Sequence, residues 1–362
     1  MPPNPHFAPA AARLGRPGAA LPKARPAPTA RPARFRQARV LIVGCGDIGQ
    51  RAARLLAPRV RLLALNRRPE QAAALRAQGI TPIAGDLDQP ATLRRLPPLA
   101  ARLLHLAPPP PEGEGDPRSL ALARALRRAR GRKNRRLRPI EHDPARQPMS
   151  RLSTTRPLAA LIYGSTSGVY GDAGGQWVSE TRPARPQTAR ARRRLAAEQC
   201  LRPLGATVLR IPGIYAPDRP RGTPRQRLLR RTPALAPADD VFTSHIHAHD
   251  LARACALALW RARPQRVLNI SDERPMKMGD YFDLAARLYA LPAPPRIPRA
   301  QAEATLSEPQ MSFMRESRRL LNHRMKRELR LRLRYPSAQE GLQSEKPPET
   351  PADSGKLSTD FS

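Results

Sequence analysis

The chain has 362 residues, enough for one large domain or two modest ones. The sequence has 65 lysines and arginines and 29 aspartates and glutamates, a formal net charge of +36. Such a charge is typical of proteins that bind nucleic acids or anionic surfaces, and also of proteins with arginine-rich surfaces and tails. Three widely separated cysteines argue against a disulfide framework, and no apolar stretch approaches the length of a membrane span, so we expect a cytoplasmic protein without a membrane partner.

Three stretches carry no apolar periodicity, and we predict that all three are disordered. They are a Pro/Ala/Arg tail at 1–36, a basic insertion at 130–157 and a polar tail at 336–362. The insertion could bind nucleic acid through its charge, but it lacks interleaved aromatic residues for base stacking. Any nucleic-acid binding is therefore expected to be unspecific.

Between these stretches, short apolar runs alternate with amphipathic helical patterns. Runs at 39–44, 60–65, 80–85 and 101–107 are predicted strands, and helices are predicted at 47–57, 69–79 and 118–129. Further strands are expected at 158–166, 206–211 and 266–271. This alternation predicts an α/β fold, a doubly wound parallel sheet of Rossmann type, formed by 37–129 and 158–215. Residues 216–335 are expected to form mainly a small substrate-binding lobe.

The first predicted strand ends in "VGCGDIG", which places Gly44, Gly46 and Gly49 in the spacing G-x-G-x-x-G. Between a strand and a helix, this spacing allows a tight turn, a close approach of the backbone to a pyrophosphate, and close helix–strand packing. The backbone N–H groups of Asp47 and Ile48, in the first turn of the predicted helix, would donate hydrogen bonds to the phosphates. The turn predicts a dinucleotide site.

The end of the second strand indicates which dinucleotide would bind. An acid there would accept a hydrogen bond from the ribose 2′-hydroxyl of NAD. The sequence instead has Asn66, Arg67 and Arg68, and two guanidinium groups suit a 2′-phosphate. We therefore expect NADP, with NAD as the alternative.

Several further motifs follow the glycine turn in order, and with it they resemble the extended short-chain dehydrogenase/reductase superfamily, in an atypical form of its NAD(P)-dependent epimerase/dehydratase branch. The resemblance covers 39–342 and skips the basic insertion. The motifs are "GDL" at 85–87, "HLAPP" at 105–109, "STSGVYG" at 165–171, "LRIPGIYAPDR" at 209–219, "HIHAHDLA" at 245–252 and "NISDERP" at 269–275.

The resemblance implies further cofactor contacts. It would place Asp86 and Leu87 at the adenine, and Ala107 and Pro108 under the nicotinamide ribose. Pro212, Gly213 and Ile214 would belong to the loop that closes over the nicotinamide.

The family's proton chemistry is carried by the pattern P-x-x-x-Y-x-x-x-K-x-x-x-E. Aligned on Pro186 and Glu198, this sequence has Arg190 in place of the tyrosine and Arg194 in place of the lysine. Arginine stays protonated, so Arg190 cannot act as a general base, although Arg194 could still hold a ribose or a phosphate.

The remaining hydroxyl groups are the candidate catalytic residues. By the resemblance, Thr166 would orient the substrate oxygen, with Ser167 beside it. Tyr170 is the nearest phenol, although a packing role under the loop is the stronger interpretation for it. His245, His247 and His249 alternate along a predicted strand, and we interpret them as a polar strand face and expect no metal.

Three functions stay open at this stage. The first is an NAD(P)-dependent oxidoreductase, epimerase or dehydratase acting on a hydroxylated small molecule, such as a nucleotide sugar. The second is a non-catalytic NADP-binding protein that reports redox state, which the missing tyrosine and lysine favour. The third is an unspecific nucleic-acid binder. We expect a monomer or a homodimer.

Overall fold

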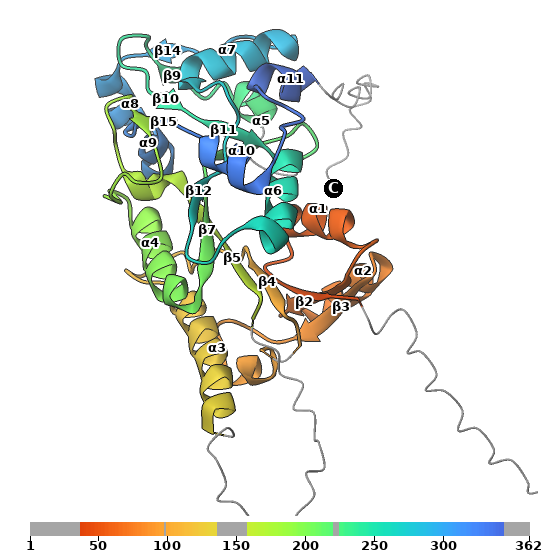
Figure 1. The fold of residues 1–362 in the computed structure, drawn as a ribbon. Coiled ribbons are helices and arrows are strands. Elements are labelled where there is room, and N and C mark those ends of the chain that lie inside the picture. Colours follow the sequence, from red (N-terminus) through yellow and green to blue (C-terminus); the bar gives the residue numbers. More distant parts are fainter. Residues whose placement is uncertain (1–36, 98, 136–157, 220–223, 344–362) are drawn as a thin grey trace, which may run out of the picture. The chain divides into compact units, whose positions relative to one another are not determined.

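A computed structural model describes residues 37–97, 99–135, 158–219 and 224–343. Within these residues the central element is a parallel sheet of seven strands in the order β12-β7-β5-β4-β1-β2-β3 (Figure 1). The strands are β1 (Arg39–Val43), β2 (Arg61–Asn66), β3 (Ile80–Ala84), β4 (Arg102–His105), β5 (Ala160–Thr166), β7 (Ala206–Ile211) and β12 (Val267–Asn269). The predicted α/β Rossmann fold is confirmed.

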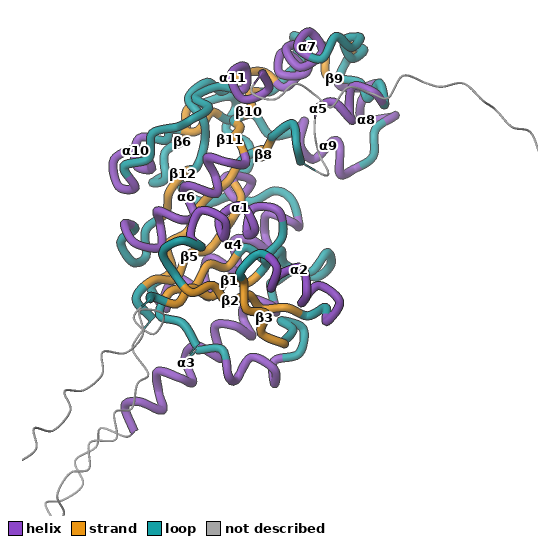
Figure 2. The backbone as a smooth tube through the Cα atoms, turned by 90° about the vertical axis from the view of Figure 1, so that its right-hand side faces the viewer, coloured by secondary structure: helices purple, strands orange, loops and turns teal. Residues whose placement is uncertain are grey.

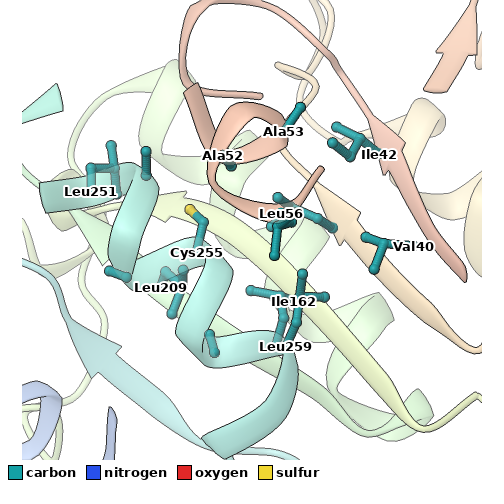
Figure 3. Close-up of a cluster of buried hydrophobic side chains, with 14 of the residues drawn as sticks. Val40, Ile42, Ala52, Ala53, Leu56, Ile162, Leu209, Leu251, Cys255 and Leu259 are labelled. Carbon is teal, nitrogen blue, oxygen red and sulfur yellow. The ribbon is translucent and has the colours of Figure 1, made fainter. Parts of the chain in front are cut away.

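Helices cover both faces of the sheet, which explains why its strands are apolar along their whole length. Val40 and Ile42 face α1 (Asp47–Leu56) and α6 (Ala248–Arg261), where Leu56 and Leu259 belong to the same cluster (Figure 3). Their neighbours in β1 point to the opposite face, toward α3 (Pro117–Arg135) and α4 (Ala189–Leu201). The shorter elements around the sheet are α2 (Ala72–Ala77), η2 (Pro69–Gln71), η3 (Pro90–Arg95), η4 (Ser167–Tyr170) and η5 (Arg202–Leu204).

A lobe of short elements lies at the end of the sheet where β7 finishes (Figure 2). It holds four strand pairs and has a cluster of buried apolar side chains of its own, around Met278, Tyr281 and Phe282. The pairs are β8 (Gly213–Tyr215) with β11 (His245–His247), β9 (Ala234–Leu235) with β14 (Arg296–Ile297), β10 (Phe242–Thr243) with β13 (Met276–Lys277), and β6 (Trp177–Val178) with β15 (Arg319–Leu320). The helices of this region are α5 (Pro224–Leu229), α7 (Met278–Leu288), α8 (Arg299–Thr305), α9 (Glu308–Met314) and α11 (Ala338–Gln343), whereas α10 (His323–Leu329) packs beside α6.

Three predicted boundaries differ from the structure. The helix α3 continues to Arg135, into the expected insertion, because 130–135 contain no proline to stop it. The expected polar tail from 336 contains α11, in which Ala338 and Leu342 are buried one turn apart. The region 216–335 is not a lobe alone, because β12 completes the central sheet and α6 packs on α1.

The remaining parts of the segments predicted to be disordered, 1–36, 136–157 and 344–362, lie outside the described residues. Among the helices that are described, none is both long and apolar enough to cross a membrane.

Candidate functional site

The residues expected to bind the cofactor share one edge of the sheet. Four of their segments follow the carboxyl ends of β1, β3, β4 and β7, and 66–68 begins with the last residue of β2. Strand order reverses between β1 and β4, and ligands of open α/β sheets bind in the crevice at such a switch point. The fold therefore brings sequence-distant segments to one place.

The three glycines of the turn meet different surroundings. Gly44 has φ +90°, and a Cβ there would lie 2.6 Å from the Ala107 Cα. A Cβ at Gly49 would lie 2.8 Å from the Gly44 carbonyl oxygen, so this glycine lets α1 pack on the turn. A Cβ at Gly46 would meet nothing within 4 Å. The turn is thus tightly packed behind Gly44 and Gly49 and open in front of Gly46.

The N-terminus of α1 faces this open side. Gly46 is the N-cap residue and no side chain caps the helix, although an α-helix leaves its first N–H groups without intrahelical partners. The Asp47 side chain is engaged elsewhere, because it accepts hydrogen bonds from Arg51 (2.7 Å) and Arg219 (2.9 Å). Burial raises the pKa of Asp47, but these two arginines outweigh it and lower the pKa overall. The first N–H groups therefore remain available to an anion.

Arg219 was not predicted as a site residue. Arg219 lies in the segment after β8, and its contact with Asp47 joins this segment to the glycine turn. Arg219 also donates to the Ile214 carbonyl oxygen in β8, and Arg51 donates to Asp218 as well as to Asp47. The motif "LRIPGIYAPDR" contains this arginine, but its contact with Asp47, 172 positions away, has no local sequence signal.

At the end of β2, Arg67 and Arg68 are exposed, and within the described residues neither guanidinium has a hydrogen bond or an ion pair. Asn66 shapes the turn instead: its side chain donates to the Arg68 carbonyl oxygen (2.7 Å). After β3, Leu87 is buried and Asp86 accepts a hydrogen bond from the Asp88 amide (3.0 Å). Two guanidinium groups therefore stand free beside the crevice.

The segment after β4 is fixed from both sides. Ala107 and its preceding residue donate to the Val43 carbonyl oxygen, and the Pro108 carbonyl oxygen accepts from Arg118. Beneath them, the buried His105 Nε2 lies 2.8 Å from the Ser119 hydroxyl, which donates to Asp116 (2.6 Å). Burial lowers the pKa of His105 to about 4, so this ring is neutral at pH 7. The sequence analysis did not predict these buried hydrogen bonds between His105, Ser119 and Asp116.

The hydroxyl segment at the end of β5 is held by a buried ion pair. Ser165 donates to Glu198 (2.6 Å), which also accepts from Arg210 (2.7 Å). Thr166 follows and accepts from the Gly168 amide (3.2 Å), so it caps η4, and Ser167 is buried beside it. The segment is rigidly positioned, and Thr166 is its half-buried hydroxyl.

Tyr170 packs as a core residue. It is 1% exposed, its hydroxyl donates to Asn269 (2.8 Å), and the Arg210 guanidinium lies 4.5 Å from its ring centroid. Burial raises its pKa, which disfavours a phenolate. These contacts agree with the packing interpretation, and we give Tyr170 no role in proton transfer.

Helix α4 presents Arg190 and Arg194 one turn apart. Arg194 donates to the Gly164 carbonyl oxygen (2.8 Å) and to the Tyr163 hydroxyl (3.3 Å). Arg190 lies over the ring of Phe313 from α9, 4.6 Å from its centroid. Two permanently charged side chains of α4 therefore contact different parts of the protein: Arg194 contacts β5 of the sheet and Arg190 contacts α9 of the lobe.

The histidines lie beside the loop after β7. Within Pro212, Gly213 and Ile214, Gly213 pairs with His245 of β11. His245 and His247 are both buried, and burial lowers the pKa of each to about 4. His245 stacks on Tyr281 with ring centroids 4.2 Å apart. In the described part of the chain, no three histidine, cysteine or acidic side chains are grouped as a metal site would require.

Comparisons with known proteins agree with this geometry. Residues 40–138 match the TrkA-N domain, an NAD(P)-binding Rossmann domain. A conserved protein of unknown function from Silicibacter pomeroyi is 30% identical, with a TM-score of 0.65; the match covers 85% of this chain and 98% of that one. The chain belongs to the family of that protein.

More distant solved structures of this fold include MoeE5 in complex with UDP-glucose and NAD, which is 20% identical with a TM-score of 0.59 over 84% of this chain and 96% of that one. A UDP-glucose 4-epimerase from Thermotoga maritima is 17% identical with a TM-score of 0.60, over 84% of this chain and 96% of that one. At these identities the likeness shows the fold. No curated protein matches the sequence.

Proposed function

We propose that the protein binds NADP(H) and transfers a hydride to or from a carbinol carbon of a hydroxylated small molecule. The observation that carries the proposal is the glycine turn, closed behind by backbone contacts of Gly44 and Gly49 and open in front of Gly46. Its position at the switch point of the sheet supports the same interpretation.

The residues present fit a dinucleotide. The uncapped first turn of α1, at Asp47 and Ile48, would bind the pyrophosphate. Asp86 and Leu87 would lie at the adenine, Ala107 and Pro108 at the nicotinamide ribose, and 212–214 over the nicotinamide. When bound, the cofactor supplies or accepts the hydride.

The free guanidinium groups of Arg67 and Arg68 favour NADP over NAD. Neither has a hydrogen bond or an ion pair among the described residues, although Arg67 lies close enough to Asp88 to add to the lowering of the Asp88 pKa by Arg118. Both guanidinium groups can therefore bind a 2′-phosphate without breaking an ion pair. Asn66 supports them by fixing the backbone of Arg68 through its side-chain amide.

At the reacting end, the chain's own groups position a substrate more readily than they move a proton. Thr166 is held in place by the buried Ser165–Glu198 hydrogen bond beside it and would orient the substrate oxygen, together with Ser167. Arg190 and Arg194 are permanent cations, so neither takes the proton that the reaction releases. Turnover is expected to be slow, since a positioned general acid or base contributes about 10²–10⁴-fold.

A second function has an observation in its favour. The proton-transfer positions of α4 are arginines, and the nearest phenol, Tyr170, is bound to Asn269 in the core. A protein that binds NADP(H) without turnover, and so reports redox state, fits these two facts. The two functions share the cofactor site and differ in whether any substrate changes the redox state of the cofactor.

The matched substitutions Gly46→Val and Gly44→Ala test the cofactor site. Gly46 has φ −82° and open space, so Gly46→Val should fold at a cost of about 1 kcal/mol for the poorer helix cap, but its side chain would stand where the pyrophosphate approaches. Gly44→Ala should lose stability instead, because of the positive φ and the contact with Ala107. NADPH binding by calorimetry and thermal unfolding separate the two effects.

A folded Gly46→Val protein that binds NADPH as tightly as the wild type would refute the proposed site. For the choice of cofactor, NADPH should bind more tightly than NADH by about 10–100-fold, since charge-assisted hydrogen bonds contribute about 1.5–3 kcal/mol. Replacing Arg67 and Arg68 by alanine should remove the difference and leave NADH binding unchanged. Equal affinities in the wild type would contradict the preference.

A further inference from the structure

Within the described residues, three arginines of helix α4 form no ion pair with a carboxylate, namely Arg190, Arg193 and Arg194. Arg194 is bound only to neutral groups, the Gly164 carbonyl oxygen and the Tyr163 hydroxyl. Arg190 contacts the aromatic face of Phe313. In contrast, Arg192 on the same helix has an acidic partner, Glu114, at 3.4 Å. Arg190 and Arg194 therefore differ from Arg192, while Arg193 donates to the Gly113 carbonyl oxygen at 2.9 Å.

Further positive charge gathers around Arg190. Its pKa is lowered first by burial and then by the like charge of Arg194, with Arg318 and Arg193 acting in the same direction. The only opposing acid is Glu316, which is 7% exposed and already bound by Arg318 at 2.6 Å. Although part of the Arg190 side chain is desolvated, the residue is exposed and Arg194 and Arg318 are half-buried, so an anion from solvent could reach the group and relieve the repulsion among these like charges. The Glu316 Oε1 has no hydrogen-bond partner, but Glu316 carries one negative charge against Arg190, Arg194 and Arg318, so these described residues keep a net positive charge.

The cluster also has a defined place relative to the hydroxyl segment. Arg194 binds the carbonyl oxygen of Gly164, just before this segment, and Arg318 binds that of Gly171, at its end, at 3.0 Å. Thr166 and Ser167 lie between these two anchored glycines. Arginines from α4 and from the segment after α9 thus bind the backbone just before and just after the hydroxyl groups in the sequence.

We propose that Arg190, Arg194 and Arg318 form an anion subsite that binds an oxyanion group of the substrate next to Thr166. This rests on the proposed function and narrows its substrate class to hydroxylated molecules that carry a carboxylate or a phosphate. Guanidinium groups suit both through paired N–H donors. The arginines that replaced the proton-transfer pair thereby gain a role in binding.

Inorganic phosphate serves as the probe in calorimetric titrations of the full chain, with and without saturating NADPH. Arg190→Gln should weaken phosphate binding by about 10-fold, the low end of what a charge-assisted hydrogen bond contributes. Arg190→Lys should retain most of the affinity because it keeps the charge. The matched control is Arg192→Gln, two residues along α4, which should stay within twofold of the wild type. Thermal unfolding of each variant reports folding separately.

Four outcomes would overturn the subsite. They are unchanged phosphate affinity in Arg190→Gln, an equal loss in Arg192→Gln, an equal loss in Arg190→Lys, and loss of phosphate binding by the wild type once NADPH is bound. The last would mean that phosphate occupies the cofactor's own phosphate position. Failure of NADPH to bind at all would refute the proposed function, while the titrations without cofactor would still decide whether the arginines bind an anion.

Discussion

Glu198→Gln should destabilise the protein more than the usual single substitution. Glu198 and Arg210 are almost completely buried, and the carboxylate accepts from both Arg210 Nη2 (2.7 Å) and Nε (3.2 Å), as well as from Ser165. Glutamine keeps the size but leaves the Arg210 charge buried without its counter-charge. Breaking a buried pair from one side costs about 3–5 kcal/mol.

Urea unfolding followed by circular dichroism measures this cost. With a slope of about 3 kcal/mol per molar urea, the midpoint should fall by about 1–2 M at an unchanged slope. Replacing both partners, Glu198→Leu with Arg210→Met, should recover most of the loss because no charge remains buried. Glu114→Gln provides the control, since Glu114 pairs with Arg192 at an exposed position and should shift the midpoint little. A Glu198→Gln midpoint equal to that of this control would refute the argument.

Three other perturbations have defined outcomes. Burial lowers the pKa of His245 to about 4 in the folded protein, below the value of about 6.5 in the unfolded chain. This difference stabilises the folded protein above pH 6.5, and the stabilisation is lost as the pH falls toward 4. His245→Phe should therefore reduce the difference in unfolding free energy between pH 7 and pH 4 by about 3 kcal/mol, as measured by urea unfolding. Arg190→Tyr with Arg194→Lys should raise kcat for any substrate that shows activity, as followed by NADPH absorbance, and should also raise KM because the anion subsite loses the charge of Arg190; an unchanged kcat would mean that the hydroxyl segment is not the reacting end. Asp250→Ala should speed hydrogen exchange at the amides of Arg334 and Tyr335, because both donate to this buried carboxylate, and protection equal to the wild type would contradict that role.

The sheet and the glycine turn could be predicted because their signals are local. The run "RVLIV" is buried on both faces, and the glycine spacing has a direct backbone meaning at Gly44 and Gly49. The carboxyl ends of parallel strands meet at one edge, so the order of motifs along the chain was enough to predict that the residues expected to bind the cofactor lie together.

The unpredicted features depend on partners distant in the sequence. Arg219 contacts Asp47 across 172 positions, and Tyr170 finds Asn269 across 99. The short helix α11 was missed because six residues are too few to show an apolar periodicity. The position of its start depends on a distant contact, since Tyr215 donates to the carbonyl oxygen of Ser337, just before the helix. In so arginine-rich a chain, composition could not distinguish the structural Arg210 from the unpaired Arg190.

Because the chain returns to the sheet at β12, the lobe and the sheet cannot be separated into two continuous segments. After β7 the chain enters the lobe, comes back as α6 and β12, enters the lobe again, and comes back once more as α10 beside α6. The lobe is therefore not one continuous C-terminal segment, and neither truncation nor recombination at a single point could remove or exchange it as a unit. A fragment ending near Tyr215 would lack an edge strand and the helix that covers α1, and would expose the apolar side chains that Figure 3 shows between α1 and α6. Relatives can then differ in the lobe only by substitutions and insertions within it, with the sheet retained as a whole.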